Sequence, residues 1–404
     1  MQAPGWLTLL LVAATLVGVA VGRWPGLRAN RASIALVGAV ALVAAGSIPL
    51  EAAWRAIDLD TLALLLGMMV LNANLKLAGF FAWSAGLTLC VARGPRALLG
   101  LVVGTTGALS ALFLNDTVCL MLAPLVLEVA RGLRRDPAPY LVGLMLAANA
   151  GSVATITGNP QNMWIGVHSG LGYGEFLLAL GPLAAASLAI VWVVVMLCFP
   201  REFRAGAFER VEPPPVRILR PLLVKSLSVS ALLLVLLFAR VPFSLAALAA
   251  AALLLVTRRV DPERVFAEFD WQLLVFFAAL FVVTGAIGEA GLAAGLEHAL
   301  GGAGSGLGGR VASTALLSNL VSNVPAVLLV GTAGELTRPE WLALAAASTL
   351  AGNLTLLGSV SNLIVVEEGR RAGLRLTFLA HLRAGVPVTL LTLLLAWAWL
   401  AAAG

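Results

Sequence analysis

Four polar stretches interrupt an otherwise apolar sequence, and they hold the side chains best suited to binding a small solute. They are residues 114–117 (LNDT), 155–162 (TITGNPQN), 321–325 (VSNVP) and 355–362 (TLLGSVSN). Amides, hydroxyls and one carboxylate can bind and release a polar solute or an ion. No nucleophile elbow or phosphate-binding loop occurs in the sequence, which argues against an enzyme or a nucleotide-driven pump.

We predict that all four stretches contribute to one binding site. The predicted binding residues are Asn115, Asp116, Thr117, Thr157, Gly158, Asn159, Gln161, Asn162, Ser322, Asn323, Gly358, Ser359, Ser361 and Asn362. A bound sodium ion would use Asn115, Asp116, Asn162, Asn323 and Asn362. No resident metal or other cofactor is expected, because the cysteines and histidines show no metal-ligand spacing.

Asp116 is the one acid placed at a predicted hairpin tip deep in an apolar region. A permanent charge at that depth costs several kcal/mol unless it is paired, hydrated or protonated. This indicates proton coupling through Asp116, with sodium as the alternative coupling ion. A second interpretation is that Asp116 only caps the second arm of the hairpin, since Asn, Asp and Thr are all good helix caps.

The breaks themselves predict a cavity. An interrupted helix leaves backbone amides and carbonyls that hydrocarbon cannot satisfy, so it persists where it lines a polar space. Four breaks in two matched pairs therefore indicate one central site built from helix ends and uncharged side chains. The alternative is that these small polar residues only help helices to pack against one another.

The elements that carry these stretches are predicted to be membrane helices. Hydrophobic residues make up 60% of the 404 residues, charged residues 11%, and the mean hydropathy is +0.99. About nine to eleven apolar segments approach the ~20 residues needed to cross a bilayer, which predicts an all-α polytopic membrane protein. The net charge of +6 comes mostly from arginines in short loops, so it indicates membrane orientation and no nucleic acid partner.

Loop charges predict two re-entrant helical hairpins of opposite direction. Residues 97–131 form two apolar arms with arginines at both ends, so this hairpin is expected to enter from the cytoplasm and leave by the same face. The flanks of a second hairpin, at about 305–332, carry little net positive charge. This second hairpin is expected to enter from outside.

Opposite hairpins predict two inverted repeats. Leu112, Asn115 and Leu120 correspond to Leu320, Asn323 and Leu328 at an offset of 208; Thr155, Gly158 and Asn162 correspond to Thr355, Gly358 and Asn362 at an offset of 200. The predicted division is a first repeat at 1–200, a cytoplasmic linker at 201–220 and a second repeat at 221–404. Broken helices are expected at about 138–170 and 340–368.

The four stretches resemble motifs of the ion-transporter superfamily. Residues 111–124 (ALFLNDTVCLMLAP) are similar to the first hairpin of ArsB-type arsenite-efflux permeases and their silicon-efflux relatives. Residues 148–162 (ANAGSVATITGNPQN) resemble the broken helix that those permeases share with NhaD-type sodium/proton antiporters and divalent-anion/sodium symporters. Residues 322–325 (SNVP) and 358–362 (GSVSN) look like the second-half counterparts.

The resemblance implies a scaffold domain, a transport domain that moves like an elevator, and a homodimer. It also departs from one subfamily: the divalent-anion symporters carry Ser-Asn-Thr at both hairpin tips, whereas this chain has Asn115-Asp116-Thr117 and Ser322-Asn323-Val324. Their sodium and carboxylate sites therefore transfer only in part.

The sequence leads to a hypothesis of secondary active transport. The predicted site holds an aspartate and no arginine, and an ionised Asp116 would repel a dianion by several kcal/mol. This favours a small inorganic oxyacid or anion, such as arsenite or silicate, exported in exchange for protons. The alternatives are a sodium/proton antiporter, sodium-coupled uptake of sulfate-like anions or dicarboxylates, a channel, and a membrane scaffold that transports nothing. The expected setting is a bacterial inner membrane, with multiple passes through the lipid bilayer.

Overall fold

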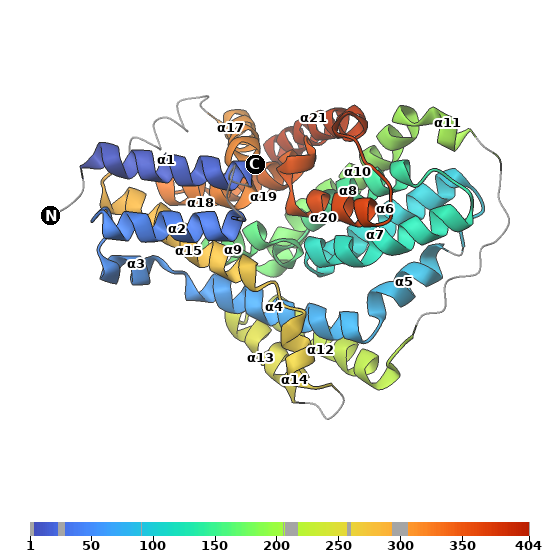
Figure 1. Ribbon diagram of the computed structural model, residues 1–404, viewed down its shortest axis with the longest axis horizontal. Coiled ribbons are helices and arrows are strands. Elements are labelled where there is room, and N and C mark those ends of the chain that lie inside the picture. Colours follow the sequence, from blue (N-terminus) through green and yellow to red (C-terminus); the bar gives the residue numbers. More distant parts are fainter. Residues whose placement is uncertain are drawn as a thin grey trace.

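The computed structural model describes residues 4–22, 29–89, 91–204, 206, 217–256, 260–292 and 306–403, and all regular elements in those ranges are helical (Figure 1). Cys90, His298 and most of the predicted 201–220 linker lie outside the described residues. The prediction of an all-helical protein is confirmed for the described part of the chain.

Two of the first five helices of the chain start at side-chain caps. Asn30 accepts a hydrogen bond from the Ser33 amide, and Asp58 accepts hydrogen bonds from the amides of Asp60 and Thr61. Such side chains satisfy amides that a helix start leaves unpaired. The helices are α1 (Gly5–Val21), α2 (Arg31–Ala44), α3 (Leu50–Ala56), α4 (Leu59–Leu77) and α5 (Phe80–Leu89).

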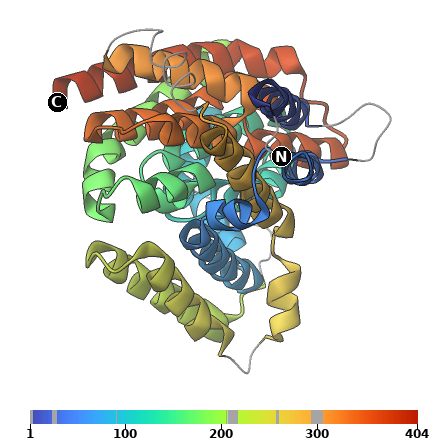
Figure 2. The ribbon, with the colours of Figure 1, turned by 90° about the vertical axis from the view of Figure 1, so that its left-hand side faces the viewer.

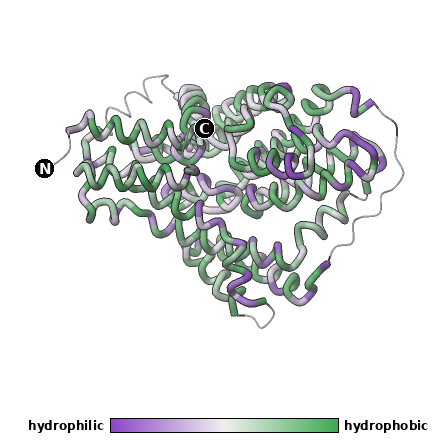
Figure 3. Tube along the Cα trace, in the orientation of Figure 1, coloured by the Kyte–Doolittle hydropathy of each residue, from purple (hydrophilic) through white to green (hydrophobic). Residues whose placement is uncertain are grey.

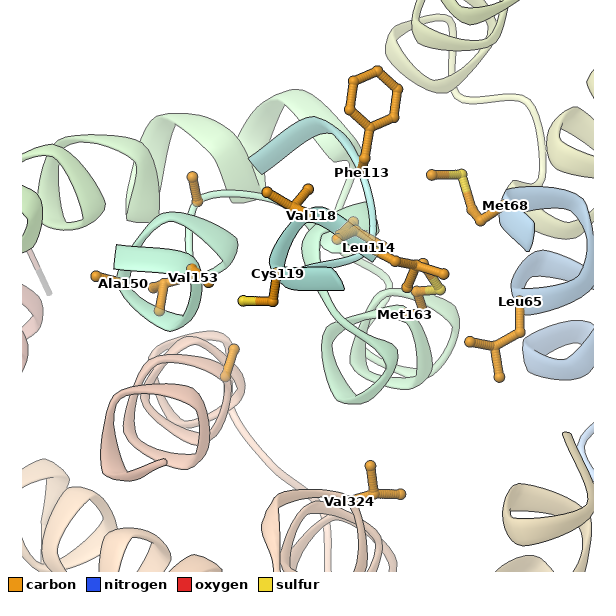
Figure 4. Close-up of a cluster of buried hydrophobic side chains, with 14 of the residues drawn as sticks. Leu65, Met68, Phe113, Leu114, Val118, Cys119, Ala150, Val153, Met163 and Val324 are labelled. Carbon is orange, nitrogen blue, oxygen red and sulfur yellow. The ribbon is translucent and has the colours of Figure 1, made fainter. Parts of the chain in front are cut away.

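A helical hairpin follows. Helices α6 (Pro95–Leu112) and α7 (Asn115–Gly132) are joined by Phe113 and Leu114, both buried. Figure 4 shows these two side chains in an apolar cluster with Leu65 and Met68 of α4. The polar residues after the turn are thereby fixed at the start of α7, because the apolar turn is anchored in the core.

The next helix is broken in its middle. Helix α8 (Pro137–Ser152) ends, a 3-10 turn η1 (Ile156–Gly158) follows, and α9 (Pro160–His168) resumes the path. Pro160 suits the first helical position because it has no amide hydrogen to satisfy there. Helices α10 (Tyr173–Cys198) and α11 (Pro200–Phe203) complete this half.

The second half has a similar order of elements. Its first helices are α12 (Arg220–Phe238), α13 (Phe243–Leu255), α14 (Pro262–Ala267) and α15 (Trp271–Glu289). Helices α17 (Leu307–Val321) and α18 (Asn323–Ala333) meet at Ser322, which has a positive φ of 80°. A second broken helix consists of α19 (Arg338–Ala351), the 3-10 turn η2 (Leu356–Gly358) and α20 (Val360–Arg371), and α21 (Phe378–Ala403) ends the fold.

Six helices of the described residues are long and apolar enough to cross a membrane: α4, α6, α10, α12, α15 and α21. Figure 3 shows hydrophobic residues along the long helices and hydrophilic residues gathered in α20 and at connections between helices. Large apolar side chains such as Leu178 and Leu379 are 77% and 76% exposed. Such exposure is stable when lipid is the solvent, so the protein is a multi-pass membrane protein.

The centre of the molecule is formed by α8 and α19. Every residue of 139–152 and of 341–351 is buried. Both segments are rich in alanine and carry no charged face, so they can be surrounded by other helices. Helices α12 and α13 lie at the lower edge in Figures 1 and 2, where α13 packs on α4.

Candidate functional site

All four polar breaks line a single cavity of about 540 Å³. The first hairpin contributes Asn115 and Asp116, and the first broken helix contributes Pro160 and Gln161. The second half contributes Ser322, Asn323, Val324, Leu357, Ser359 and Val360. Stretches separated by about 200 residues in the sequence are thus brought to one cavity.

The remaining wall comes from helices that the sequence did not link to the site. Asn30 and Arg31 stand at the start of α2, and Asp270 and Gln272 stand at the start of α15. Asn30 donates a hydrogen bond to Gln272 at 2.8 Å, which joins these two helix starts. The expectation of a site without arginine is therefore wrong, because Arg31 comes from a loop-flanking cluster that only tertiary packing carries to the cavity.

Asp116 is half-buried on the cavity wall, and its carboxylate accepts a hydrogen bond from the hydroxyl of Ser361. Its charge interacts with those of Arg31 and Asp270. The start of α7 has no side-chain cap, and the Asp116 amide is satisfied by the Asn115 side chain at 3.0 Å. The carboxylate is therefore directed to the cavity and to Ser361, and it does not cap α7.

Asn149 of α8 joins the first hairpin to the second broken helix. Its Oδ1 accepts hydrogen bonds from Asn115 Nδ2 at 3.3 Å and from Ser359 Oγ at 3.0 Å. Its Nδ2 donates to Asn353 Oδ1 at 2.9 Å and to Asn362 Oδ1 at 3.3 Å. Sequence reasoning missed Asn149 as a site residue, although it lies in the segment that carries the family resemblance.

Asn162 and Asn362 bind backbone carbonyls at the two breaks. Asn162 Nδ2 donates to the carbonyls of Ser152 and Thr155 at 3.1 and 3.0 Å. Asn362 Nδ2 donates to the carbonyls of Gly352 and Thr355 at 2.9 and 3.0 Å. Both side chains are fully buried, and they satisfy carbonyls that the interrupted helices leave unpaired.

Thr349 of α19 contacts the first break. Its hydroxyl accepts hydrogen bonds from Asn159 Nδ2 at 3.3 Å and from Gln161 Nε2 at 3.2 Å. Thr157 lies on another side of the same break, where its hydroxyl is 3.2 Å from that of Tyr173. Gln161 is therefore positioned on the cavity wall, whereas Thr157 points toward α10.

Asn323 links the second hairpin to the second break. The amide orientation that gives both of its polar atoms partners places Nδ2 3.1 Å from the Gly358 carbonyl and 3.2 Å from the Ser348 carbonyl. Ser318 lies 2.6 Å from the same side chain. The hairpin tip is therefore fixed on the broken helix beside the cavity.

Gly158 and Gly358 allow the backbone to turn tightly at the breaks. A Cβ on Gly158 would lie 2.5 Å from the Ser152 carbonyl and 2.8 Å from the Ser110 carbonyl. A Cβ on Gly358 would lie 2.9 Å from the Gly352 carbonyl. Only glycine fits such close approaches of backbone to backbone.

The structure thus separates the predicted residues by position. Those on the cavity wall are Asn115, Asp116, Gln161, Ser322, Asn323 and Ser359. Those behind the wall that position it are Gly158, Asn159, Asn162, Gly358, Ser361 and Asn362. Thr117 and Thr157 are outside the lining of this cavity. Among the described residues, no group of three or more His, Cys, Asp or Glu residues could hold a metal ion.

Comparison with known proteins places this architecture among membrane transporters. A family model described as CitMHS, citrate transporter, matches residues 9–347. The silicon efflux transporter LSI3 of Oryza sativa subsp. japonica is 32% identical, over 91% of this chain and 91% of its own length. The putative transporter arsB of Dictyostelium discoideum is 23% identical, over 91% and 86% respectively. The resemblance to the ion-transporter superfamily is confirmed.

Two solved structures share the fold. The YdaH transporter of Alcanivorax borkumensis has a TM-score of 0.55 at 19% identity, covering 97% of this chain and 95% of that chain. MtrF of Neisseria gonorrhoeae has a TM-score of 0.55 at 13% identity, covering 99% and 94%. Since the family model spans most of the sequence and the LSI3 match covers nearly all of both chains, the protein is a secondary transporter that belongs to the CitMHS citrate transporter family.

Proposed function

We propose that the protein couples proton movement to the transport of a small oxyacid or its anion, with Asp116 as the proton carrier. The observation that carries this proposal is the single cavity onto which all four breaks open, with the Asp116 carboxylate on its wall. Interrupted helices in a bilayer supply polar groups for a solute, and an acid among them can bind a proton. Arsenite- and silicate-like oxyacids are the substrates that the relatives favour, since LSI3 is described as a silicon efflux transporter.

The proposal includes two inverted repeats, residues 1–200 and 221–404. Two contacts that are equivalent at an offset of 200 support this proposal. Asn149 contacts Ser359, and the residues at the corresponding positions, Thr349 and Asn159, also contact each other. Reciprocal contacts of this kind are characteristic of a two-fold relation between equivalent surfaces. The equivalent amides of Asn162 and Asn362 also reach carbonyls 7 and 10 residues before them in each half.

Re-entrant hairpins are part of the same proposal, and helix length supports it for the second hairpin. Helix α18 has 11 residues. At ~1.5 Å per residue it spans roughly 16 Å, about half of a hydrocarbon core of ~30 Å. In Figure 1, α6 and α7 occupy the right-hand part of the view and α18 the left-hand part. A short arm that ends at a polar tip in mid-membrane suits a transport domain that carries its site past a scaffold. We propose an elevator-type movement in a homodimer of the bacterial inner membrane.

The charge of the solute decides the form of coupling. A neutral oxyacid competes with a proton for the polar wall around Asp116, which gives exchange and efflux. An anion is a second candidate, because Arg31 lines the cavity and the family model is described as a citrate transporter. The positive charge of Arg31 can offset the repulsion between an ionised Asp116 and an anion in the cavity.

Sodium coupling is favoured by one observation. Asn162 Oδ1 is buried and has no hydrogen-bond partner. A free amide oxygen beside interrupted backbone can bind a hard cation. A sodium/proton antiporter or a sodium-coupled anion transporter would use this atom.

The test is a flux measurement in proteoliposomes that hold a pH-sensitive dye. Arsenous acid, silicic acid, citrate, succinate and sulfate are added in turn, with sodium or with potassium as the only cation. Proton movement evoked by an oxyacid or its anion without sodium is the expected result. Proton movement evoked by sodium alone would instead support the antiporter, and absence of any coupled proton flux would overturn the proposal.

A further inference from the structure

Arg31 is a cation on the cavity wall that coupling through Asp116 leaves without a role. It is the first residue of α2, and it lines the cavity together with Asp116. Its Nη1 atom is buried without a hydrogen-bond partner, and its Nη2 reaches the Leu357 carbonyl at 3.4 Å. A guanidinium has five donor hydrogens, and buried donors without partners cost free energy. Arg31 therefore has a buried donor that no described residue satisfies.

The two acids on the wall do not pair directly with Arg31. No carboxylate of the described residues lies within 4.0 Å of the guanidinium. Asp116 accepts its hydrogen bond from Ser361, and Asp270 accepts one from the Leu273 amide at 3.2 Å as the cap of α15. The charges of Arg31 and Asp116 interact over a distance longer than that of an ion pair. A ligand between them can thus reach Arg31 without displacing an ion pair.

The Arg31 side chain lies beside Gly22 and the Leu357 carbonyl. Gly22, the cap residue of α1, has a positive φ of 73°. A Cβ added at this position would lie 3.2 Å from Arg31 Nε, so glycine leaves room for the arginine side chain. The Leu357 carbonyl contacts the other end of the guanidinium. The group therefore lies between α1 and the second break, and a guanidinium can bind two oxygens of one ligand through a planar pair of donors.

Helix starts add to the positive potential. The cavity lining includes the first residues of α2, α7, α9, α18 and α20, and the cap residue Asp270 of α15. Each helix start carries roughly +0.5 charge from its unpaired amides. Helices α18 and α20 have no side-chain cap at their starts, so no side chain of the cap residue satisfies their first amides. Asn323 and Val360, the first residues of these two helices, line the same cavity as Arg31.

We propose that Arg31 binds the charge of the transported solute, and that the solute occupies the cavity as a small oxyanion, either a carboxylate or an inorganic oxyanion. This inference rests on the proposed function and refines its substrate class. An oxyanion on Arg31 lies near Asp116, where an ionised carboxylate would repel it. The anion and a proton on Asp116 are therefore bound together, so the proton travels with the anion.

The first experiment measures ligand binding to the purified full-length protein by isothermal titration calorimetry. The probes are succinate, citrate and sulfate as anions, and arsenous acid, which is neutral at pH 7. Arg31→Gln should weaken anion binding about 10- to 100-fold, the range expected for a lost charge-assisted hydrogen bond. Arg31→Lys should retain part of the affinity, because it keeps the charge without the planar fork. The anion that binds shows whether the solute is a carboxylate or an inorganic oxyanion.

The matched control is Arg55→Gln. Arg55 lies on α3 with its side chain 81% exposed, paired with Glu51 and outside the cavity lining. This variant should bind every probe like the wild type. Thermal unfolding of each variant in detergent separates loss of binding from loss of fold, and if Arg31→Gln does not fold, Arg31→Lys provides the comparison of anion with neutral probe.

The second readout is proton uptake when an anion binds in weakly buffered solution. The wild type should take up protons with succinate, citrate or sulfate, whichever binds, and Asp116→Asn should not. Anion affinity unchanged in a folded Arg31→Gln protein would overturn the role of Arg31, as would binding of arsenous acid alone. Failure of the broader function is distinguishable, because it would show as absent proton-coupled flux in wild-type proteoliposomes.

Discussion

The hydroxyl of Ser361 donates a hydrogen bond to the carboxylate of Asp116, although 245 positions separate the two residues. Ser361 lies in the first turn of α20, after the second break, and Asp116 lies in the first turn of α7. The acid of one half is therefore positioned by the broken helix of the other half. Any movement of the hairpin relative to that helix would change the environment of the carboxylate.

Asp116→Asn is predicted to abolish the pH dependence of transport and to leave the fold intact. The amide has nearly the same shape as the carboxylate and can still accept from Ser361, but it cannot ionise. Initial transport rates across a pH series in proteoliposomes measure the effect. Asp261→Asn serves as the control, since Asp261 is 80% exposed and pairs with Arg264 on the surface. A variant at 116 that keeps the wild-type pH profile would remove Asp116 from coupling.

Asn162→Ala and Asn362→Ala are each predicted to destabilise the protein and to weaken ligand binding. Each change leaves two buried carbonyls without their side-chain donor, at about 1–3 kcal/mol for each unsatisfied group. Thermal unfolding in detergent and calorimetry measure the two effects.

The control for these asparagines is Asn74→Ala. Asn74 is buried in α4 and donates to the Val70 carbonyl of its own helix at 2.8 Å. Loss of this bond does not open a break, so the change in unfolding temperature should be smaller. Equal effects at all three positions would mean that the breaks have no special need for their asparagines.

Gly158→Ala is predicted to be more damaging than Gly358→Ala. The added methyl group would meet two carbonyls at 2.5 and 2.8 Å at position 158, and one carbonyl at 2.9 Å at position 358. Backbone cannot yield as a flexible side chain does, so the first break must distort. Yield of folded protein and unfolding temperature measure the difference. Gly104→Ala on α6 has no atom within 4 Å of the new methyl group and should be neutral or slightly stabilising.

Glu202→Ala is predicted to loosen the start of the predicted linker. Glu202 Oε1 accepts hydrogen bonds from Arg135 Nε and Tyr140 Oη, each at 2.8 Å, and thereby ties α11 to the α7–α8 connection. The loss should cost roughly 1–3 kcal/mol, because a shielded arginine and a tyrosine lose a charged partner. Glu51→Ala removes an ion pair whose side chains are 81% and 87% exposed, and it should change the unfolding temperature little. Similar losses in both variants would contradict this interpretation.

The sequence determined that this protein lies in a lipid bilayer, that it is helical, and where its helices stop. Apolar runs must be helical in hydrocarbon because each backbone group needs a partner within its own segment. Pro160, Gly158 and Gly358 interrupt such runs by local geometry, so the breaks could be located without a structure. The helices that follow the breaks begin at Asn115, Pro160, Asn323 and Val360, within the polar stretches themselves.

Tertiary structure alone decided which residues face the cavity and which support it. Asn149 and Thr349 lie within regular buried helices, and Arg31 and Asp270 belong to helix starts in distant parts of the chain. Their spacing carries no signal, because a side chain's direction into a shared cavity depends on how whole helices pack. The same holds for Asn162 and Asn362, whose amides turn to the carbonyls of their own breaks. Local sequence fixes where a helix ends, whereas only packing fixes what its end meets.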